Sequence, residues 1–177
     1  DAPFLNKNVM HSVHMRLLDR IFSGCVFIEI KRNPIHNVRS IISARMAGCR
    51  KEKSTEGWWS VKPRQWERFK ESDMITQACA QVLFIHENIE SDLNYLGVER
   101  RHIVDYENLC SAPRETLDGI AEFLISHGIN VRELNNVPDS FPVSVGRQCD
   151  QNTEKRILKE VTNMQVMLEK QIGNRTH

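Results

Sequence analysis

Apolar residues occur in short blocks along the chain, and two of these blocks have the character of β-strands. Residues 25–31 read CVFIEIK, apolar on both faces apart from Glu29, and residues 102–109 read HIVDYENL. A short apolar run that is bounded by turn residues is typical of a strand covered on both faces. We therefore predict strands in these two segments.

Other blocks place an apolar residue every three or four positions, which predicts amphipathic helices. These helices are expected over residues 8–22, 34–46, 72–96, 113–127 and 153–171. The predicted buried stripes are Val9, Val13, Leu17 and Ile21 in the first helix, Ile75, Ala78, Val82, Ile85, Ile89 and Leu93 in the third, and Ile157, Val161, Met164 and Leu168 in the last. Pro34 suits the first position of the second helix, since proline is favoured there.

This order of elements predicts a helix-rich α/β fold, in which a parallel sheet is flanked by helices. We expect it to form a single domain over residues 1–177. Two strands are fewer than the roughly four to six of a typical sheet. Either further strands escape recognition, or the missing strands precede Asp1; we favour the second interpretation. The domain is then expected to lack its N-terminal strand in this sequence.

Composition is that of a globular protein, with 40% hydrophobic and 27% charged residues. The net charge of +1 gives no reason to expect a nucleic-acid partner, so any anion site must be local. No apolar run approaches the roughly 20 residues that cross a bilayer, so no membrane segment is expected. Self-association into a homodimer is left open.

The five cysteines are scattered and lack the spacing of metal ligands, so no metal site is expected. Free thiols in a reducing compartment, the cytoplasm, are favoured. One disulfide formed in a secretory lumen of the Golgi type is the alternative.

The end of the first predicted strand carries a candidate anion site. Arg32 follows the strand directly, at the end where ligands bind in open α/β sheets. Its planar guanidinium can donate two parallel hydrogen bonds to a phosphate, and the next helix offers its N-terminal amides. Ser40, eight residues after Arg32, can add a hydroxyl donor. The alternative is a surface arginine with a solvent-facing serine.

This arrangement of Arg-x-Pro with a serine eight residues after the arginine resembles the 3'-phosphate-binding motif of sulfotransferases that use 3'-phosphoadenosine 5'-phosphosulfate (PAPS). Two longer blocks, residues 3–34 and IVDYENLCSAPRETLDGIAEFL at 103–124, are similar to segments of the same family. The resemblance spans about residues 3–124 and continues weakly to 173. It implies a fold like that of P-loop NTPases. It also implies transfer of a sulfuryl group from PAPS to a hydroxyl or amine acceptor, without a metal, leaving 3'-phosphoadenosine 5'-phosphate (PAP).

The resemblance also implies roles for individual residues. Arg32 and Ser40 would bind the 3'-phosphate, and Tyr106 would lie near the adenine. Lys7 matches the family lysine that neutralises charge beside the bridging oxygen of the transferred group, where charge stabilisation supplies most of the catalysis. Arg147, which follows Gly146, would reach a phosphate from a loop that closes over the nucleotide.

No general base is assigned by the resemblance. The cytosolic branch of the family has a histidine two residues after the lysine, and this position is Val9 here. His11 and His14 on the following turns are candidates within hydrogen-bond reach of an acceptor. A carboxylate from sequence upstream is the alternative.

The segment over residues 49–70 carries Trp58, Trp59 and Trp66. Aromatic rings suit the wall or lid of a pocket for the acceptor. The same rings could instead fill a small satellite core, and the sequence leaves both interpretations open.

The family's glycine-rich loop, which wraps the 5'-phosphosulfate by its amides, has no counterpart in this sequence. We expect this loop before Asp1. A different class of function is then the alternative: a truncated, non-catalytic α/β module that binds a nucleotide or a protein partner. A relative of the P-loop nucleotide kinases is disfavoured, because the residues that would hold magnesium are not recognised.

Overall fold

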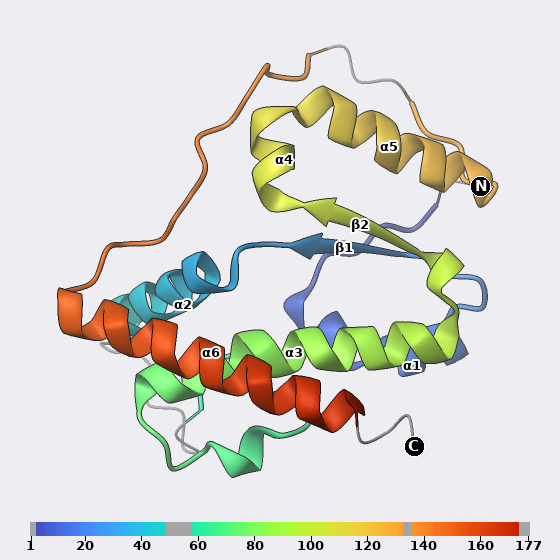
Figure 1. The fold of residues 1–177 in the computed structure, drawn as a ribbon. Helices are drawn as coiled ribbons and strands as arrows, with labels where there is room; N and C mark the ends of the chain where they lie inside the picture. The colour runs from blue at the N-terminus through green and yellow to red at the C-terminus, as the bar shows by residue number, and fades with distance from the viewer. Residues whose placement is uncertain (1–2, 49–57, 133–135, 174–177) are drawn as a thin grey trace. The chain divides into compact units, whose positions relative to one another are not determined.

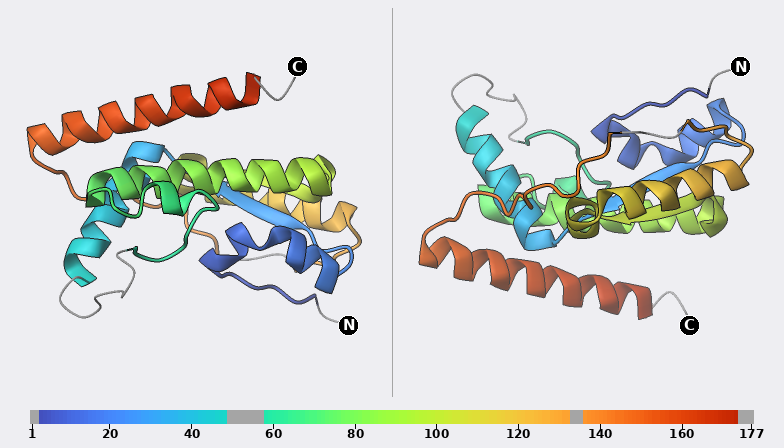
Figure 2. Two further views of the ribbon diagram at one scale, coloured as in Figure 1. Left: turned by 90° about the horizontal axis from the view of Figure 1, so that it is seen from below. Right: turned by 90° about the horizontal axis from the view of Figure 1, so that it is seen from above.

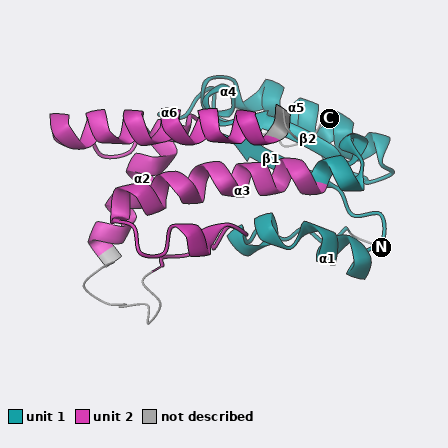
Figure 3. Ribbon diagram, turned by 60° about the horizontal axis from the view of Figure 1, so that its bottom comes forward, with its two compact units in different colours: residues 1–32, 93–144 teal, residues 33–92, 145–177 magenta. Residues whose placement is uncertain are grey.

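The structure is a computed structural model that describes residues 3–48, 58–132 and 136–173. The chain forms two compact units (Figure 3). Unit 1 comprises Asp1–Arg32 and Leu93–Ser144, and unit 2 comprises Asn33–Asp92 and Val145–His177. The single domain over residues 1–177 stays a prediction.

Unit 1 contains two strands, β1 (Phe27–Lys31) and β2 (Arg101–Asp105). The first lies within its predicted segment, but the strand predicted over residues 102–109 ends at Asp105, because Tyr106 already begins a helix. The two strands pair in parallel, with Phe27 opposite Arg101 and Lys31 opposite Asp105 (Figure 1). The described residues thus form a helix-rich α/β structure with a two-stranded parallel sheet. The strand expected before Asp1 stays a prediction.

Two helices follow β2 in unit 1. The short helix α4 (Tyr106–Ser111) begins at once, because Asp105 caps it by accepting a hydrogen bond from the amide of Asn108 at 2.8 Å. Helix α5 (Pro113–Ser126) then returns along β2 in the opposite direction (Figure 1). The rings of His102 on β2 and Phe123 on α5 lie 5.3 Å apart.

The N-terminal part of unit 1 corrects the prediction of one continuous helix over residues 8–22. A 3₁₀ helix, η1 (Val9–Val13), is followed by α1 (Met15–Ile21), with His14 between them at φ −125°. A 3₁₀ helix has three residues per turn, so the apolar spacing does not keep one face across the junction. Of the predicted stripe, Val9, Leu17 and Ile21 are each more than half exposed, and α1 buries Met15 instead.

The second strand begins from a further 3₁₀ turn, η3 (Val98–Arg100), which ties the elements of unit 1 together. Arg100 donates to a carboxylate oxygen of Asp19 on α1 at 2.6 Å and to the carbonyl oxygen of Cys25, just before β1. One guanidinium therefore joins α1, the start of β1 and the start of β2.

Unit 2 is built on three helices, α2 (Pro34–Gly48), α3 (Met74–Leu96, its last turn in unit 1) and α6 (Gln151–Gly173). The 3₁₀ turn η2 (Trp66–Arg68) precedes α3. Helix α6 runs along α3 in the same direction (Figures 1 and 2). The three helices share one core, whose members include Val38, Ile42, Ala78, Phe84, Ile157, Val161 and Met164. Pro34 begins α2 as predicted, and the stripe predicted for α6 is confirmed.

Helix α3 buries polar residues that the apolar pattern did not reveal. Gln77, Gln81, Asn88 and Asp92 are all buried, and their spacing places them on one face of the helix. Gln81 donates to the carbonyl oxygens of Trp59 and Val61, at 3.0 and 2.9 Å. Asn88 accepts from the amide of Arg64 at 2.9 Å. This polar face fixes the irregular segment over residues 58–66 by its backbone.

Among the described residues, no helix combines the length and the apolar character that crossing a membrane requires.

Candidate functional site

The register of the sheet brings two of the predicted binding residues together in unit 1. Lys31 and Asp105 are paired, so Arg32 and Tyr106 each follow the carboxyl end of their strand by one residue. The guanidinium carbon of Arg32 lies over the Tyr106 ring, 5.0 Å from its centroid. Such a stack holds the guanidinium plane in one orientation.

Ser144 completes this cluster through its backbone. Arg32 donates to the carbonyl oxygen of Ser144 at 2.5 Å, and the amide of Ser144 donates to the hydroxyl of Tyr106 at 3.2 Å. Arg32 and Ser144 are also the residues at which the chain twice leaves unit 1. The cluster of Arg32, Tyr106 and Ser144 therefore joins the carboxyl ends of β1 and β2 to the backbone of the segment that ends at Ser144. Sequence reasoning missed Ser144, because its contribution is made by main-chain atoms.

Ser40 lies in unit 2, on the second turn of α2, and its hydroxyl donates to the carbonyl oxygen of His36 at 3.0 Å. The start of α2 is capped by Asn33, whose side-chain oxygen accepts from the amides of Ile35 and His36 at 3.0 and 3.4 Å. Two of the N-terminal amides expected to face an anion are thus engaged within the protein. The order Asn33-Pro34 was an available signal for this cap.

Gly146 places the backbone of its segment against α2 within unit 2. Its φ of +73° lies in the left-handed region that favours glycine. A Cβ atom at this position would stand 2.6 Å from Cβ of Arg39 and 3.0 Å from the amide nitrogen of Ser40. Glycine is required here both by conformation and by space. Arg147, the predicted phosphate ligand, is the next residue and is exposed.

The segment that contains Gly146 is anchored at its far end by an ion pair. Glu154 on α6 accepts from Nε and a terminal nitrogen of Arg39, at 3.0 and 2.6 Å. Its other oxygen accepts from the amide of Cys149 at 3.1 Å. The hydrogen bond from Arg39 is the main cause that lowers the pKa of the Glu154 carboxyl; partial burial opposes it and the Cys149 amide adds to it.

Replacing Glu154 with glutamine should make folding stability less dependent on pH at the acid end. A carboxyl whose pKa is lowered by folding stabilises the native state above its ordinary pKa, and this contribution disappears as the pH falls through the lowered value. We expect Glu154→Gln to cost about 1 kcal/mol at pH 7 and clearly less at about pH 3. Urea unfolding midpoints at the two pH values measure this difference. An equal cost at both would contradict it.

The predicted catalytic residues lie in the N-terminal segment of unit 1. Lys7 is exposed and directly precedes Asn8, whose side chain caps η1 by accepting from the amide of Met10 at 2.9 Å. His11 lies within η1, and exposed His14 separates η1 from α1. The roles of Lys7 and His11 stay predictions.

The tryptophans of residues 58–66 lie in unit 2. Trp58 is buried in the core, and its indole nitrogen donates to the carbonyl oxygen of Val61 at 3.1 Å. Trp66 packs against the same core, with its ring 6.3 Å from that of Trp58 at 70°. Trp59 is half-buried. The positions of Trp58 and Trp66 agree with the alternative that these rings fill a core. Their role as a wall for the acceptor stays a prediction.

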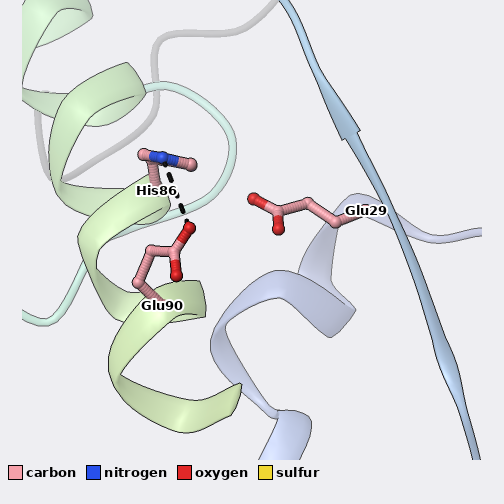
Figure 4. A group of neighbouring side chains, drawn as sticks. All are labelled: Glu29, His86 and Glu90. Carbon is pink, nitrogen blue, oxygen red and sulfur yellow. Dashed lines mark ion pairs between the residues drawn. The ribbon is translucent and has the colours of Figure 1, made fainter. Parts of the chain in front are cut away.

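Each unit also contains ion pairs between neighbouring side chains. On α3, Nε2 of His86 and a carboxylate oxygen of Glu90 lie 3.8 Å apart on successive turns (Figure 4). Glu29 on β1, also drawn in Figure 4, forms an ion pair with Arg101 of β2 at 3.3 Å. Because Arg101 starts the partner strand, this pair braces the sheet behind its carboxyl end.

The cysteines that the structure describes, Cys25, Cys79, Cys110 and Cys149, are free thiols. Burial raises the pKa of Cys79 to about 12, so this residue stays a protonated core side chain. Cys49 lies outside the described residues.

Comparison with known proteins gives one match. A family model described as the sulfotransferase family matches residues 1–127. No curated protein and no solved structure matches the chain. The matched region includes both strands, Arg32, Ser40 and Tyr106, whereas Ser144, Gly146, Arg147 and α6 follow it.

Proposed function

Because the chain belongs to the sulfotransferase family, we propose that it transfers a sulfuryl group from PAPS to a hydroxyl or amine of an acceptor. Family membership supports sulfuryl transfer as the reaction class. The donor is proposed from the residues at the strand ends, Arg32 and Tyr106 first, and the kind of acceptor from the family resemblance.

The stack of Arg32 on Tyr106 is the single observation that carries the choice of donor. PAPS differs from other activated sulfates by an adenosine that carries a 3'-phosphate. A guanidinium suits that dianion, because its fork donates two parallel hydrogen bonds. An aromatic ring with a hydroxyl suits the purine, and it lies at the same strand ends. The two residues therefore supply the two kinds of contact that this nucleotide needs.

Ser40 and Arg147 enter the proposal through the sequence. Ser40 follows Arg32 by eight residues as in the family motif. Arg147 follows Gly146, where an added Cβ would stand 3.0 Å from the Ser40 amide nitrogen. Since Asn33 caps the first amides of α2, the proposed contacts to the 3'-phosphate come mainly from side chains.

In the proposed reaction, the bond between sulfur and the 5'-phosphate oxygen breaks and a bond from sulfur to the acceptor forms. PAP leaves with the electron pair, and the acceptor proton passes to a base. Lys7 would neutralise the charge that develops on the leaving phosphate. His11 or His14 would take the proton.

Nucleotide binding tests the choice of donor directly. Isothermal titration of the whole chain with PAP and with adenosine 5'-monophosphate, which lacks the 3'-phosphate, compares the two affinities. We expect PAP to bind at least about tenfold more tightly, since a charge-assisted hydrogen bond contributes roughly 1.5–3 kcal/mol. Equal affinities would overturn the assignment of the 3'-phosphate to this site.

Turnover is measured separately. Radiolabelled PAPS is incubated with the protein and with small alcohols, phenols, amines, sugars and tyrosine peptides in turn, and labelled product is quantified. Product with one class identifies the acceptor. Tight binding of PAP without product from any class would favour the non-catalytic nucleotide-binding module instead.

A further inference from the structure

The segment over residues 145–150 meets α2 at the residue proposed to bind the 3'-phosphate. All contacts in question lie within unit 2. At one end Gly146 presses on the backbone of Arg39 and Ser40, where even one added carbon would stand 2.6 Å from the Arg39 side chain and 3.0 Å from the Ser40 amide. Contact this close leaves no room for the segment to approach α2 further.

The other end of the segment is fixed by three polar groups. Glu154 binds the Arg39 side chain and the Cys149 amide at once. The side chains of Arg39 and Glu154 are each 20% exposed, so water screens this pair less than a surface ion pair. Arg39 thus takes part at both ends, through its Cβ at Gly146 and through its guanidinium at Glu154.

We propose that Gly146 and the Arg39–Glu154 pair form a latch that holds residues 145–150 against α2 and so positions Ser40 and Arg147 for one phosphate group. Gly146 and Glu154 are then positioning residues, since neither needs to touch the nucleotide. The proposal rests on the proposed function. It extends that function to residues that the family match does not cover.

A matched pair of glycine substitutions tests the latch. Gly146 and Gly128 have the same φ of +73°, but a Cβ at Gly128 would meet nothing within 4 Å. Gly146→Ala and Gly128→Ala therefore impose the same backbone strain, and they differ in the contact with α2. Glu154→Ala removes the other end of the latch, and Glu169→Ala, at an exposed position on the same helix, is its control.

Three measurements are made on each variant: affinity for PAP, affinity for adenosine 5'-monophosphate, and hydrogen exchange of the amides of residues 145–150 without nucleotide. We expect Gly146→Ala and Glu154→Ala to bind PAP about tenfold more weakly, with the monophosphate unchanged and faster exchange in the segment. The two control variants should match the wild type in PAP affinity and in exchange of this segment. Melting temperatures confirm that all variants are folded.

The possible outcomes separate the two proposals. Unchanged PAP affinity in Gly146→Ala overturns the latch, and so does an equal loss for both nucleotides, which would indicate a general distortion. If the wild type itself shows no preference for PAP, the proposed function fails, and the positioning role fails with it. In that case hydrogen exchange of the amides of residues 145–150 still shows whether this segment is held against α2.

Discussion

Replacing Arg64 with alanine is expected to lower the free energy of unfolding by about 3 kcal/mol, because it removes an ion pair from a buried carboxylate. Asp92 has no exposed surface and forms an ion pair with Arg64. A charge removed from water is stable only while it is paired. Urea unfolding followed by circular dichroism measures this change in the free energy of unfolding. The midpoint should shift, while the dependence of the free energy on urea concentration stays the same.

A surface pair provides the control for this prediction. Arg156 is paired with Asp73, and both side chains are nearly half exposed, so Arg156→Ala should cost less than about 1 kcal/mol. The double variant Arg64→Ala/Asp92→Asn should recover part of the loss, since its buried group is neutral. If Arg64→Ala costs no more than Arg156→Ala, the buried pair does not stabilise unit 2 as described.

Replacing Arg32 with alanine is expected to remove about 1.5–3 kcal/mol of the preference for PAP over adenosine 5'-monophosphate. This corresponds to a change of roughly 10- to 150-fold in the ratio of the two dissociation constants. The guanidinium is proposed to contact only the 3'-phosphate, so affinity for the monophosphate should change little. Titration calorimetry of both nucleotides against the variant gives the ratio.

Two further variants separate charge from geometry at this position. Arg32→Lys retains the cation without the planar fork, and it should recover only part of the preference. Arg114→Ala removes an exposed arginine at the start of α5 and should leave the ratio unchanged. A ratio in Arg32→Ala equal to that of the wild type would show that the phosphate is bound elsewhere.

Local signals in the sequence were sufficient for most elements of the fold. Short-range patterns of apolar residues, proline and glycine gave the first strand, the first half of the second, the start of α2 at Pro34 and the buried stripe of α6. The second half of the segment predicted as the second strand is helix α4 instead. The prediction of one N-terminal helix was wrong, because an apolar spacing does not distinguish a continuous α-helix from a 3₁₀ helix followed by a short α-helix. The buried polar face of α3 was missed because burial of Gln81 and Asn88 depends on backbone groups of a segment about 20 residues away in the sequence.

The candidate site was predictable to the extent that a family motif marks it. Arg32 and Tyr106 were named from the resemblance, but their stacking depends on the pairing of Lys31 with Asp105. Strands so far apart in sequence have no connecting turn to set their register, because a parallel pair is joined by a long crossover. The contacts of Ser144 and Gly146 are made by main-chain atoms, which leave no side-chain signal in a single sequence.

The parallel pairing of β1 with β2 also has a consequence for biosynthesis. Unit 1 is discontinuous, and the whole of residues 33–92 is translated between its two parts. As the chain leaves the ribosome, the edge of β1 that pairs with β2 therefore stays unpaired until β2 has emerged. Residues 33–92 of unit 2 can collapse before that point. Pairing across so long a loop is intrinsically slow and exposes aggregation-prone strands. Nascent chains in which β2 has not yet left the ribosome should thus be the ones that depend most on a chaperone.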